Sequence, residues 1–216
     1  MKRRQAQAAS RRRLIVISLA ALALLVASML LSLQRDGLDR TALNRAGIVL
    51  LEPPREVPEL GLQDQHGQPW GVEQRLGRWH LLFFGYTYCP DICPSTLADL
   101  RLLRAELPAE LAGQIQIGLV SVDPWRDSPE QLRNYLQFFD ASFLGLSGTP
   151  EQLRLLTRAL SVAWIEPDRS QPDYLVDHSG QVVMIDPRGR YAGFIRPPFD
   201  AEQLAPRLLE VLRSRD

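Results

Sequence analysis

Cys89 and Cys93 are the residues whose types and spacing point most clearly to chemistry. They are the only two cysteines of the chain and lie in the stretch FFGYTYCPDICP, residues 83–94. The apolar residues before them predict a buried strand, and the residues from Pro94 onward predict a helix. The pair therefore lies where a strand's carboxyl end leads into a helix, a usual ligand position in α/β folds. Since a helix N-terminus stabilises negative charge, we expect it to lower the thiol pKa values.

The spacing of the cysteines favours metal binding over a disulfide. If Cys93 lies in the first helical turn and Cys89 just before it, their Cβ atoms are about 5–6 Å apart on one face. A relaxed disulfide needs about 3.8 Å, whereas two sulfurs each about 2.3 Å from a metal ion tolerate a wider separation. A disulfide between the two cysteines remains an alternative, because Cys89 can lie outside the helix. A purely structural bridge would close a loop of only five residues, for which the entropic stabilisation is smallest.

A second candidate stretch is DPWRDSPE, residues 123–130, which follows another apolar run at residues 115–122. The run predicts a strand of the buried, parallel type. By the same strand-end argument Asp123 is placed to face the cysteines. The alternative is that Asp123 and Asp127 only shape the turn before a helix that Ser128 caps and Pro129 begins.

The elements that must position these residues alternate between strands and helices. Strands are predicted within residues 58–63, 69–70, 79–85, 115–122, 143–146 and 162–165, and helices over residues 94–107, 129–139 and 200–213 and from Thr149. Residues 182–185 and 191–195 predict a hairpin. The order predicts an α/β fold, a mixed sheet with helices on both faces. We expect His66 to lie in an exposed turn and His80 to be a sheet residue rather than a ligand.

The N-terminus predicts a membrane anchor. Residues 14–33 are twenty residues without a charge and follow a basic flank, residues 1–13. Twenty apolar residues span a hydrocarbon core of about 30 Å, and a basic flank stays cytoplasmic. A cleaved signal peptide is the alternative, although its apolar region is usually shorter. We therefore expect a cytoplasmic N-terminus, an anchor at residues 14–33, a tether at residues 34–54 and one domain at residues 55–216 in the periplasm.

The charge of the predicted exported part argues against nucleic acid as a partner. Residues 1–36 carry seven of the 25 basic and one of the 25 acidic residues, so the remainder has 18 basic against 24 acidic side chains. An acidic domain repels nucleic acid and attracts basic partners.

Three ordered motifs resemble one family. FFGYTYCPDICP, DPWRDSPE, and VDHS followed by VVMIDPRGR are similar to those of the Sco/SenC family of membrane-anchored copper-binding proteins, over roughly residues 55–214. The resemblance implies a thioredoxin-like fold and a copper site made by Cys89, Cys93 and His178. It also implies a role in assembling the binuclear copper centre of cytochrome c oxidase. Asp123 and Asp177 would be outer-shell residues that orient a ligand.

The chemistry of this implied site agrees with copper. Thiolates select Cu(I), and an added imidazole lets the same site hold Cu(II). The leading hypothesis is a copper metallochaperone that serves the oxidase's copper-bearing subunit, with another copper chaperone or a thiol reductant as a further partner.

Three alternatives stay open at this point. A thiol-disulfide reductase that keeps the oxidase's copper-ligand cysteines reduced would use Cys89 and Cys93 catalytically, although the usual redox motif has two intervening residues. A thiol peroxidase would leave His178 unexplained. A structural zinc site would need a fourth protein ligand. Whether the protein is an enzyme, and which copper oxidation state it delivers, are left open by the sequence.

Overall fold

The computed structural model describes residues 16–29 and 37–214. The chain divides into two compact units, Met1–Leu38 and Asp39–Asp216. In the first unit, residues 16–29 form a helix with exposed apolar side chains such as Leu24. No helix among the described residues is long and apolar enough to cross a membrane. Six residues of the predicted anchor, 14–15 and 30–33, lie outside the described part.

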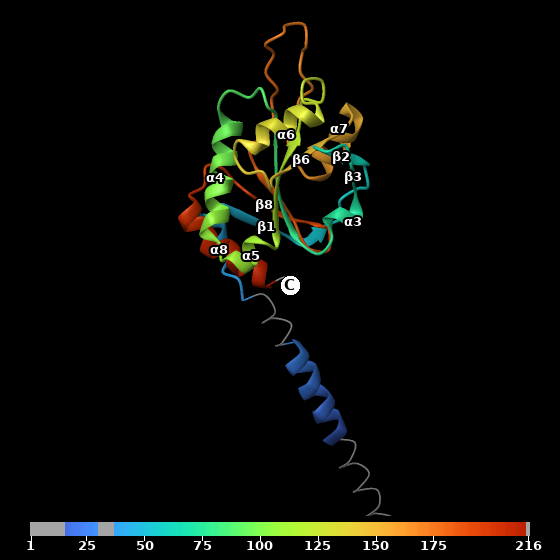
Figure 1. Cartoon of the computed structure of the whole chain (residues 1–216). Coiled ribbons are helices and arrows are strands. Elements are labelled where there is room, and N and C mark those ends of the chain that lie inside the picture. Colours follow the sequence, from blue (N-terminus) through green and yellow to red (C-terminus); the bar gives the residue numbers. More distant parts are fainter. Residues whose placement is uncertain (1–15, 30–36, 215–216) are drawn as a thin grey trace, which may run out of the picture. The chain divides into compact units, whose positions relative to one another are not determined.

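The second unit is built on one eight-stranded sheet with the strand order β1-β8-β7-β4-β5-β6-β2-β3 (Figure 1). The strands are β1 (Ile48–Arg55), β2 (Leu62–Asp64), β3 (Pro69–Trp70), β4 (Trp79–Gly85), β5 (Ile115–Ser121), β6 (Leu144–Ser147), β7 (Val182–Ile185) and β8 (Tyr191–Ile195). The helices are α2 (Arg40–Arg45), α3 (Val72–Arg75), α4 (Ile92–Glu106), α5 (Ala109–Ala112), α6 (Pro129–Gln137), α7 (Pro150–Ala159) and α8 (Ala201–Ser214).

Strand β4 is the centre of the sheet and points its carboxyl end at the cysteines. All seven of its residues are buried, as expected for an apolar strand covered on both faces. It pairs parallel to β5, from Trp79 opposite Ile115 to Gly85 opposite Ser121, and antiparallel to β7 on its other side. The two parallel strands β4 and β5 therefore end at the same edge, which brings the cysteine stretch and residues 123–127 together.

Helix α4 begins within the cysteine stretch. Leu97, Leu100 and Leu103 recur at helical spacing and are fully buried, so this face holds the helix against the core. Leu107 ends the helix in an extended conformation before Pro108, which disfavours helix in the residue before it. Cys93 lies in the first turn of α4 and Cys89 before it, as the sequence predicts.

The tether predicted at residues 34–54 is wrong over most of its length. Arg40–Arg45 form α2, and Ile48–Arg55 form the edge strand β1, which pairs antiparallel with β8. The reason is that the apolar residues at the start of β1 find their partners almost 150 residues later, with Ile48 opposite Ile195. Local composition, with two prolines in the stretch, does not reveal a pairing of that separation.

The predicted strand at residues 162–165 is reduced to a single bridge between Trp164 and His178. The hairpin of β7 and β8, the capping box that begins α7 and the closing helix are confirmed. His66 is exposed in the turn between β2 and β3. His80 is buried in β4 against the edge of the Trp70 ring, and burial lowers its pKa to about 4, so the ring is neutral in the fold.

Candidate metal centre

The turn between β4 and α4 presents two free thiols to one crevice. The backbone N–H of Cys89 donates to the carbonyl of Tyr86 over 3.3 Å, which closes the turn. Cys89 is half-buried and Cys93 fully buried, and neither forms a disulfide in the described part of the chain. Cys89 lines a pocket at the surface, while Cys93 lies against the end of the sheet.

Gly85 makes room for the buried sulfur. A Cβ at this position would lie 2.9 Å from Cys93 Sγ, 2.7 Å from a ring carbon of Phe83 and 3.1 Å from Leu119. Cβ atoms do not approach other heavy atoms that closely, so a larger residue would displace the sulfur or the strand. The local sequence carries no signal for this role beyond the position of the glycine within the cysteine stretch.

Gly85→Ala is expected to weaken both the fold and the metal site. Overpacking a closed interior costs about 1–3 kcal/mol of unfolding free energy, and here part of the strain falls on Cys93. Denaturant unfolding without metal and copper competition against a chelator measure the two effects. Gly113→Ala is the matched control, because a Cβ there meets its nearest atoms only at 3.7 Å. If Gly85→Ala binds copper as tightly as the wild type, the absence of a side chain at residue 85 is not needed to seat Cys93 Sγ in the metal site.

His178 reaches the cysteines from a different part of the chain. Its Nε2 lies 3.7 Å from Cys93 Sγ, and its Nδ1 lies 3.2 Å from the carbonyl oxygen of Ser179. The carbonyl can only accept a hydrogen bond, so it fixes the proton on Nδ1 and leaves the Nε2 lone pair facing the sulfur. Burial lowers the pKa of His178, which keeps the ring neutral and able to bind a metal ion.

The backbone and neighbouring rings hold the imidazole in this position. Ile165 donates its N–H to the carbonyl of Asp177 and Ser179 to that of Ala163, which fixes the chain on both sides of His178. The Phe83 and Tyr86 rings pack against the imidazole in T-shaped arrangements, with centroids 6.0 Å and 5.9 Å away.

The three donor atoms fit one soft metal ion. The ligand atoms of Cys89, Cys93 and His178 lie within 4.8 Å of one another. Metal bonds of about 2.0–2.3 Å allow two donors of one ion to be at most about 4.6 Å apart, so small side-chain rotations complete the site. Two sulfurs and one imidazole are the donors that copper prefers. The fold thus brings together the two cysteines and the histidine that the family resemblance implies as one site.

The expected lowering of the thiol pKa is wrong for Cys93. Burial, with Cys89 as a second cause, raises the pKa of the Cys93 thiol far above its usual value. The helix N-terminus is too weak to offset the loss of water around a fully buried sulfur. Metal binding must therefore displace the Cys93 proton.

The two outer-shell candidates lie in different surroundings. Asp123 is fully buried, accepts a hydrogen bond from the Tyr174 hydroxyl over 2.8 Å and pairs with Arg126 over 2.5 Å. Asp177 is exposed, and its negative charge partly opposes the lowering of the His178 pKa. Asp177 lines the pocket at the donor atoms, whereas Asp123 is not among the residues that line it.

Asp127 is the carboxylate that braces the cysteine turn. It accepts hydrogen bonds from the N–H of Thr87 over 3.2 Å, from the Thr87 hydroxyl over 2.6 Å and from the Ser121 hydroxyl over 2.7 Å. Burial raises the pKa of Asp127, although these hydrogen bonds oppose the shift. The sequence interpretation in which this residue only shapes its own turn misses the contact to Thr87, 40 residues away in the chain.

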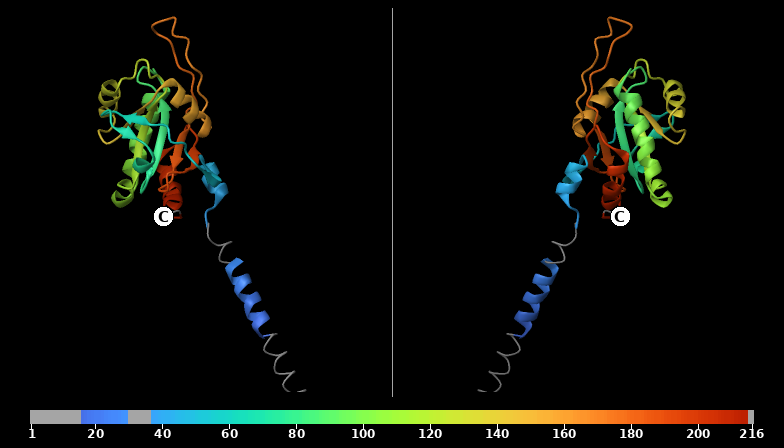
Figure 2. Two further views of the ribbon diagram at one scale, coloured as in Figure 1. Left: turned by 90° about the vertical axis from the view of Figure 1, so that its right-hand side faces the viewer. Right: turned by 90° about the vertical axis from the view of Figure 1, so that its left-hand side faces the viewer.

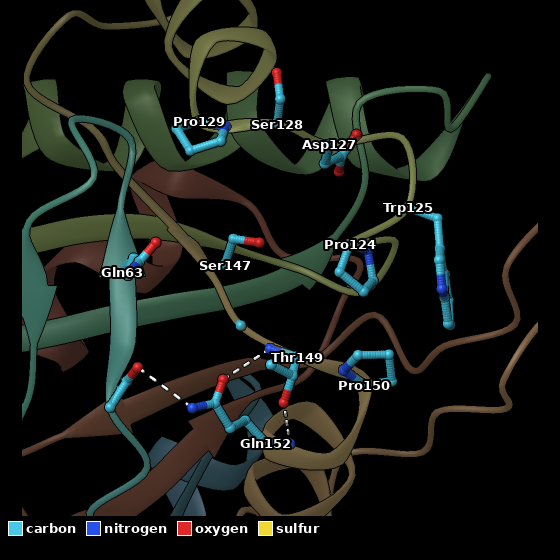
Figure 3. A pocket seen from close by; sticks show the side chains of 12 residues that line it. Gln63, Pro124, Trp125, Asp127, Ser128, Pro129, Ser147, Thr149, Pro150 and Gln152 are labelled. Carbon is cyan, nitrogen blue, oxygen red and sulfur yellow. Dashed lines mark hydrogen bonds between the residues drawn. The ribbon is translucent and has the colours of Figure 1, made fainter.

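Two pockets lie in this region, one at the donor atoms and one beside residues 123–127. One lies at the donors themselves and is lined by residues that include Tyr86, Cys89, Ile92, Leu175 and His178. Figure 3 shows the other, of about 440 Å³, between Pro124, Trp125 and Asp127 on one wall and Gln63, Ser147 and Thr149 on the opposite one. Thr149 and Gln152 satisfy each other's polar groups there. None of the three donor residues lines this second pocket, whereas Cys89 and His178 line the first.

Comparison with known proteins gives concordant results. The SCO1/SenC family model matches residues 51–213. One relative is a Stutzerimonas stutzeri protein whose name gives copper binding as a provisional assignment. It is 42% identical to this chain over 190 residues, which cover 88% of this chain and 93% of that protein. The mitochondrial protein SCO2 of Saccharomyces cerevisiae is 34% identical over 174 residues. That alignment covers 79% of this chain and 56% of the yeast protein, so the chain spans little more than half of that relative.

A solved structure confirms the predicted fold class. The crystal structure of yeast Sco1 with copper bound superposes with a TM-score of 0.69 at 31% identity, covering 74% of this chain and 90% of that one. The prediction of a thioredoxin-like mixed sheet flanked by helices is therefore confirmed for the second unit.

Proposed function

The chain belongs to the SCO1/SenC family, and from this premise we propose that it is a copper metallochaperone. It binds copper through Cys89, Cys93 and His178 and delivers it to the binuclear copper site of cytochrome c oxidase. The observation that carries the proposal is the convergence of two thiols and one oriented imidazole within 4.8 Å. Copper is the cargo of this site.

The donor set supports copper as the metal. Two thiolates bind Cu(I) strongly, and the neutral imidazole adds the nitrogen that Cu(II) needs. The half-buried Cys89 supports transfer, because an acceptor can approach the metal from that side. Yeast Sco1 and Arabidopsis thaliana ScoI have both been crystallised with copper bound.

The proposed place of work is the periplasmic side of the inner membrane. The uncharged residues 14–33 and the basic flank before them support a single-pass anchor with the copper-binding domain exported. Such an arrangement would hold the site near a membrane-bound oxidase. The copper-bearing subunit is the proposed client, and another copper chaperone or a thiol reductant is the proposed supplier of metal or electrons.

A thiol-disulfide reductase is the second candidate function. The observation in its favour is that both cysteines are free and their sulfurs close, with Cys89 accessible to a partner disulfide. In this reaction the Cys89 thiolate attacks a client disulfide. Cys93 then resolves the mixed disulfide, so two client thiols form as this chain gains one disulfide.

A transfer experiment with the apo copper-bearing domain of the oxidase separates the two functions. Incubated with the copper-loaded chain, the reduced domain is expected to gain copper as the chain loses it, in equal amounts. Incubated with the reduced, copper-free chain, the domain with its ligand cysteines oxidised is expected to stay oxidised. Thiol formation in the client without copper transfer would reverse the assignment in favour of the reductase.

A further inference from the structure

Residues 166–177, here called the histidine loop, lead directly into His178. Figures 1 and 2 show this part of the chain, in orange, extending from the edge of the domain. Most of its residues are exposed, and it contains no helix or strand. A protruding loop without regular structure needs specific contacts to deliver a ligand to one place.

Arg126 supplies several of those contacts. Its Nη2 donates to the carbonyl of Tyr174 over 3.0 Å and its Nη1 to the carbonyl of Pro172 over 3.4 Å. The guanidinium carbon also lies 3.6 Å from the centre of the Tyr174 ring, a cation–π contact. One side chain thus engages two backbone carbonyls and one ring of the histidine loop.

Asp123 fixes the geometry of this contact. It has no exposed surface, and its carboxylate holds Arg126 Nε on one oxygen and the Tyr174 hydroxyl on the other. A buried carboxylate with two charge-assisted or hydroxyl hydrogen bonds is a strong and directional anchor. Asp123 therefore holds the Arg126 guanidinium against the Tyr174 ring by binding both side chains.

Tyr86 connects the Arg126 contact to the metal ligand His178. Its hydroxyl accepts a hydrogen bond from the N–H of Val176 over 3.3 Å, and its ring forms a T-shaped pair with the imidazole of His178. Arg126 also lies over the Tyr86 ring, 5.7 Å from its centre. The path from Arg126 to the imidazole is thus short and consists of packed groups.

The cysteines depend on a different residue of the same short loop. Asp127 holds Thr87 in the turn before Cys89, whereas Asp123 and Arg126 hold the histidine loop. Arg126 reaches the cysteine turn only through ring contacts, with its guanidinium 4.9 Å from the centre of the Tyr88 ring and 5.7 Å from that of Tyr86. Its hydrogen bonds all go to Asp123 and the histidine loop. Loss of Arg126 should accordingly disturb the imidazole more than the dithiol.

We propose that Arg126, fixed by Asp123, is a positioning residue that keeps the histidine loop closed so that His178 completes the copper site. The inference rests on the proposed copper function. It makes Arg126 a determinant of Cu(II) binding above all, because Cu(II) depends on the imidazole more than Cu(I) does.

Arg126→Gln tests the proposal in the full chain with reduced thiols. Cu(II) affinity is expected to fall by about 10- to 100-fold, the usual effect of losing a residue that orients a metal ligand. Cu(I) affinity should fall less. In the His178→Ala background, Arg126→Gln should cause no further loss of Cu(I) affinity, since the residue it acts through is gone.

Two further variants test whether a loss of copper affinity in Arg126→Gln comes only from general destabilisation of the fold. Arg190→Gln is the matched control, because it likewise removes an arginine from a buried aspartate, Asp186, but in the β7–β8 turn. It is expected to leave copper binding unchanged. Tyr174→Phe keeps the Asp123–Arg126 pair and the ring but loses the hydroxyl hydrogen bond, so it tests the same contact if Arg126→Gln does not fold. A several-fold loss of Cu(II) affinity is expected for Tyr174→Phe, again absent in the His178→Ala background.

Wild-type Cu(II) affinity in Arg126→Gln and Tyr174→Phe would overturn the inference, as would equal losses of Cu(I) affinity with and without His178. A wild-type chain that binds no copper would instead overturn the proposed function itself.

Discussion

Cys89→Ser and Cys93→Ser are each expected to weaken Cu(I) binding by about 100- to 1,000-fold. Structural zinc sites with four ligands gain about 10–16 kcal/mol, or about 2.5–4 kcal/mol per ligand, and each 1.4 kcal/mol is a factor of ten. A serine hydroxyl is a hard, protonated donor at neutral pH, so it does not replace the soft thiolate. Competition titration with a Cu(I) chelator under anaerobic conditions measures the loss.

Folding has to be separated from metal binding at Cys93. Its side chain is fully buried, and a serine there places a hydroxyl next to Gly85 and Phe83. Cys93→Ala avoids this polar group and should lose copper affinity to the same extent while unfolding near the wild-type midpoint. Retention of tight Cu(I) binding by either Cys93 variant would remove the buried thiol from the site.

His178→Ala is expected to lower Cu(II) affinity by about 100-fold, with a smaller effect on Cu(I). The imidazole supplies the single nitrogen donor, its Nε2 faces Cys93 Sγ at 3.7 Å, and its tautomer is fixed by Ser179. In this variant both thiolates remain available to bind Cu(I), so its affinity falls less. Loss of the nitrogen signal from the electron paramagnetic resonance spectrum of the Cu(II) form reports the same change directly.

His66→Ala is the matched control for this variant, because it makes the same substitution at an exposed histidine in the β2–β3 turn. It should bind both copper ions like the wild type. Equal Cu(II) affinity in His178→Ala and His66→Ala would show that the imidazole is not a ligand, and the reductase function would then gain support.

The cysteine end of the site could be predicted from local sequence. A continuous apolar run makes β4 a buried strand, and the leucines of α4 recur at helical spacing, so the position of Cys89 and Cys93 at their junction follows. The dithiol and the helix start needed no knowledge of distant parts of the chain. The family resemblance added His178, which neither periodicity nor spacing connects to the cysteines.

The parts that could not be predicted depend on contacts between distant segments. Strand β1 exists because Ile48 pairs with β8, and the raised pKa of Cys93 reflects burial by the assembled sheet. The bracing contacts of Asp127 to Thr87 and of Arg126 to the histidine loop join segments 40 to 48 residues apart. A motif such as DPWRDSPE shows that its residues act together but not which segments they hold.

The most direct test of the central claim is a copper titration of the full chain with both thiols reduced. We expect one tightly bound copper ion per chain. The Cu(II) form is expected to show sulfur-to-copper charge transfer together with a nitrogen ligand signal. Absence of copper binding, with Cys89 and Cys93 cycling readily between dithiol and disulfide, would contradict the account and identify a redox protein instead.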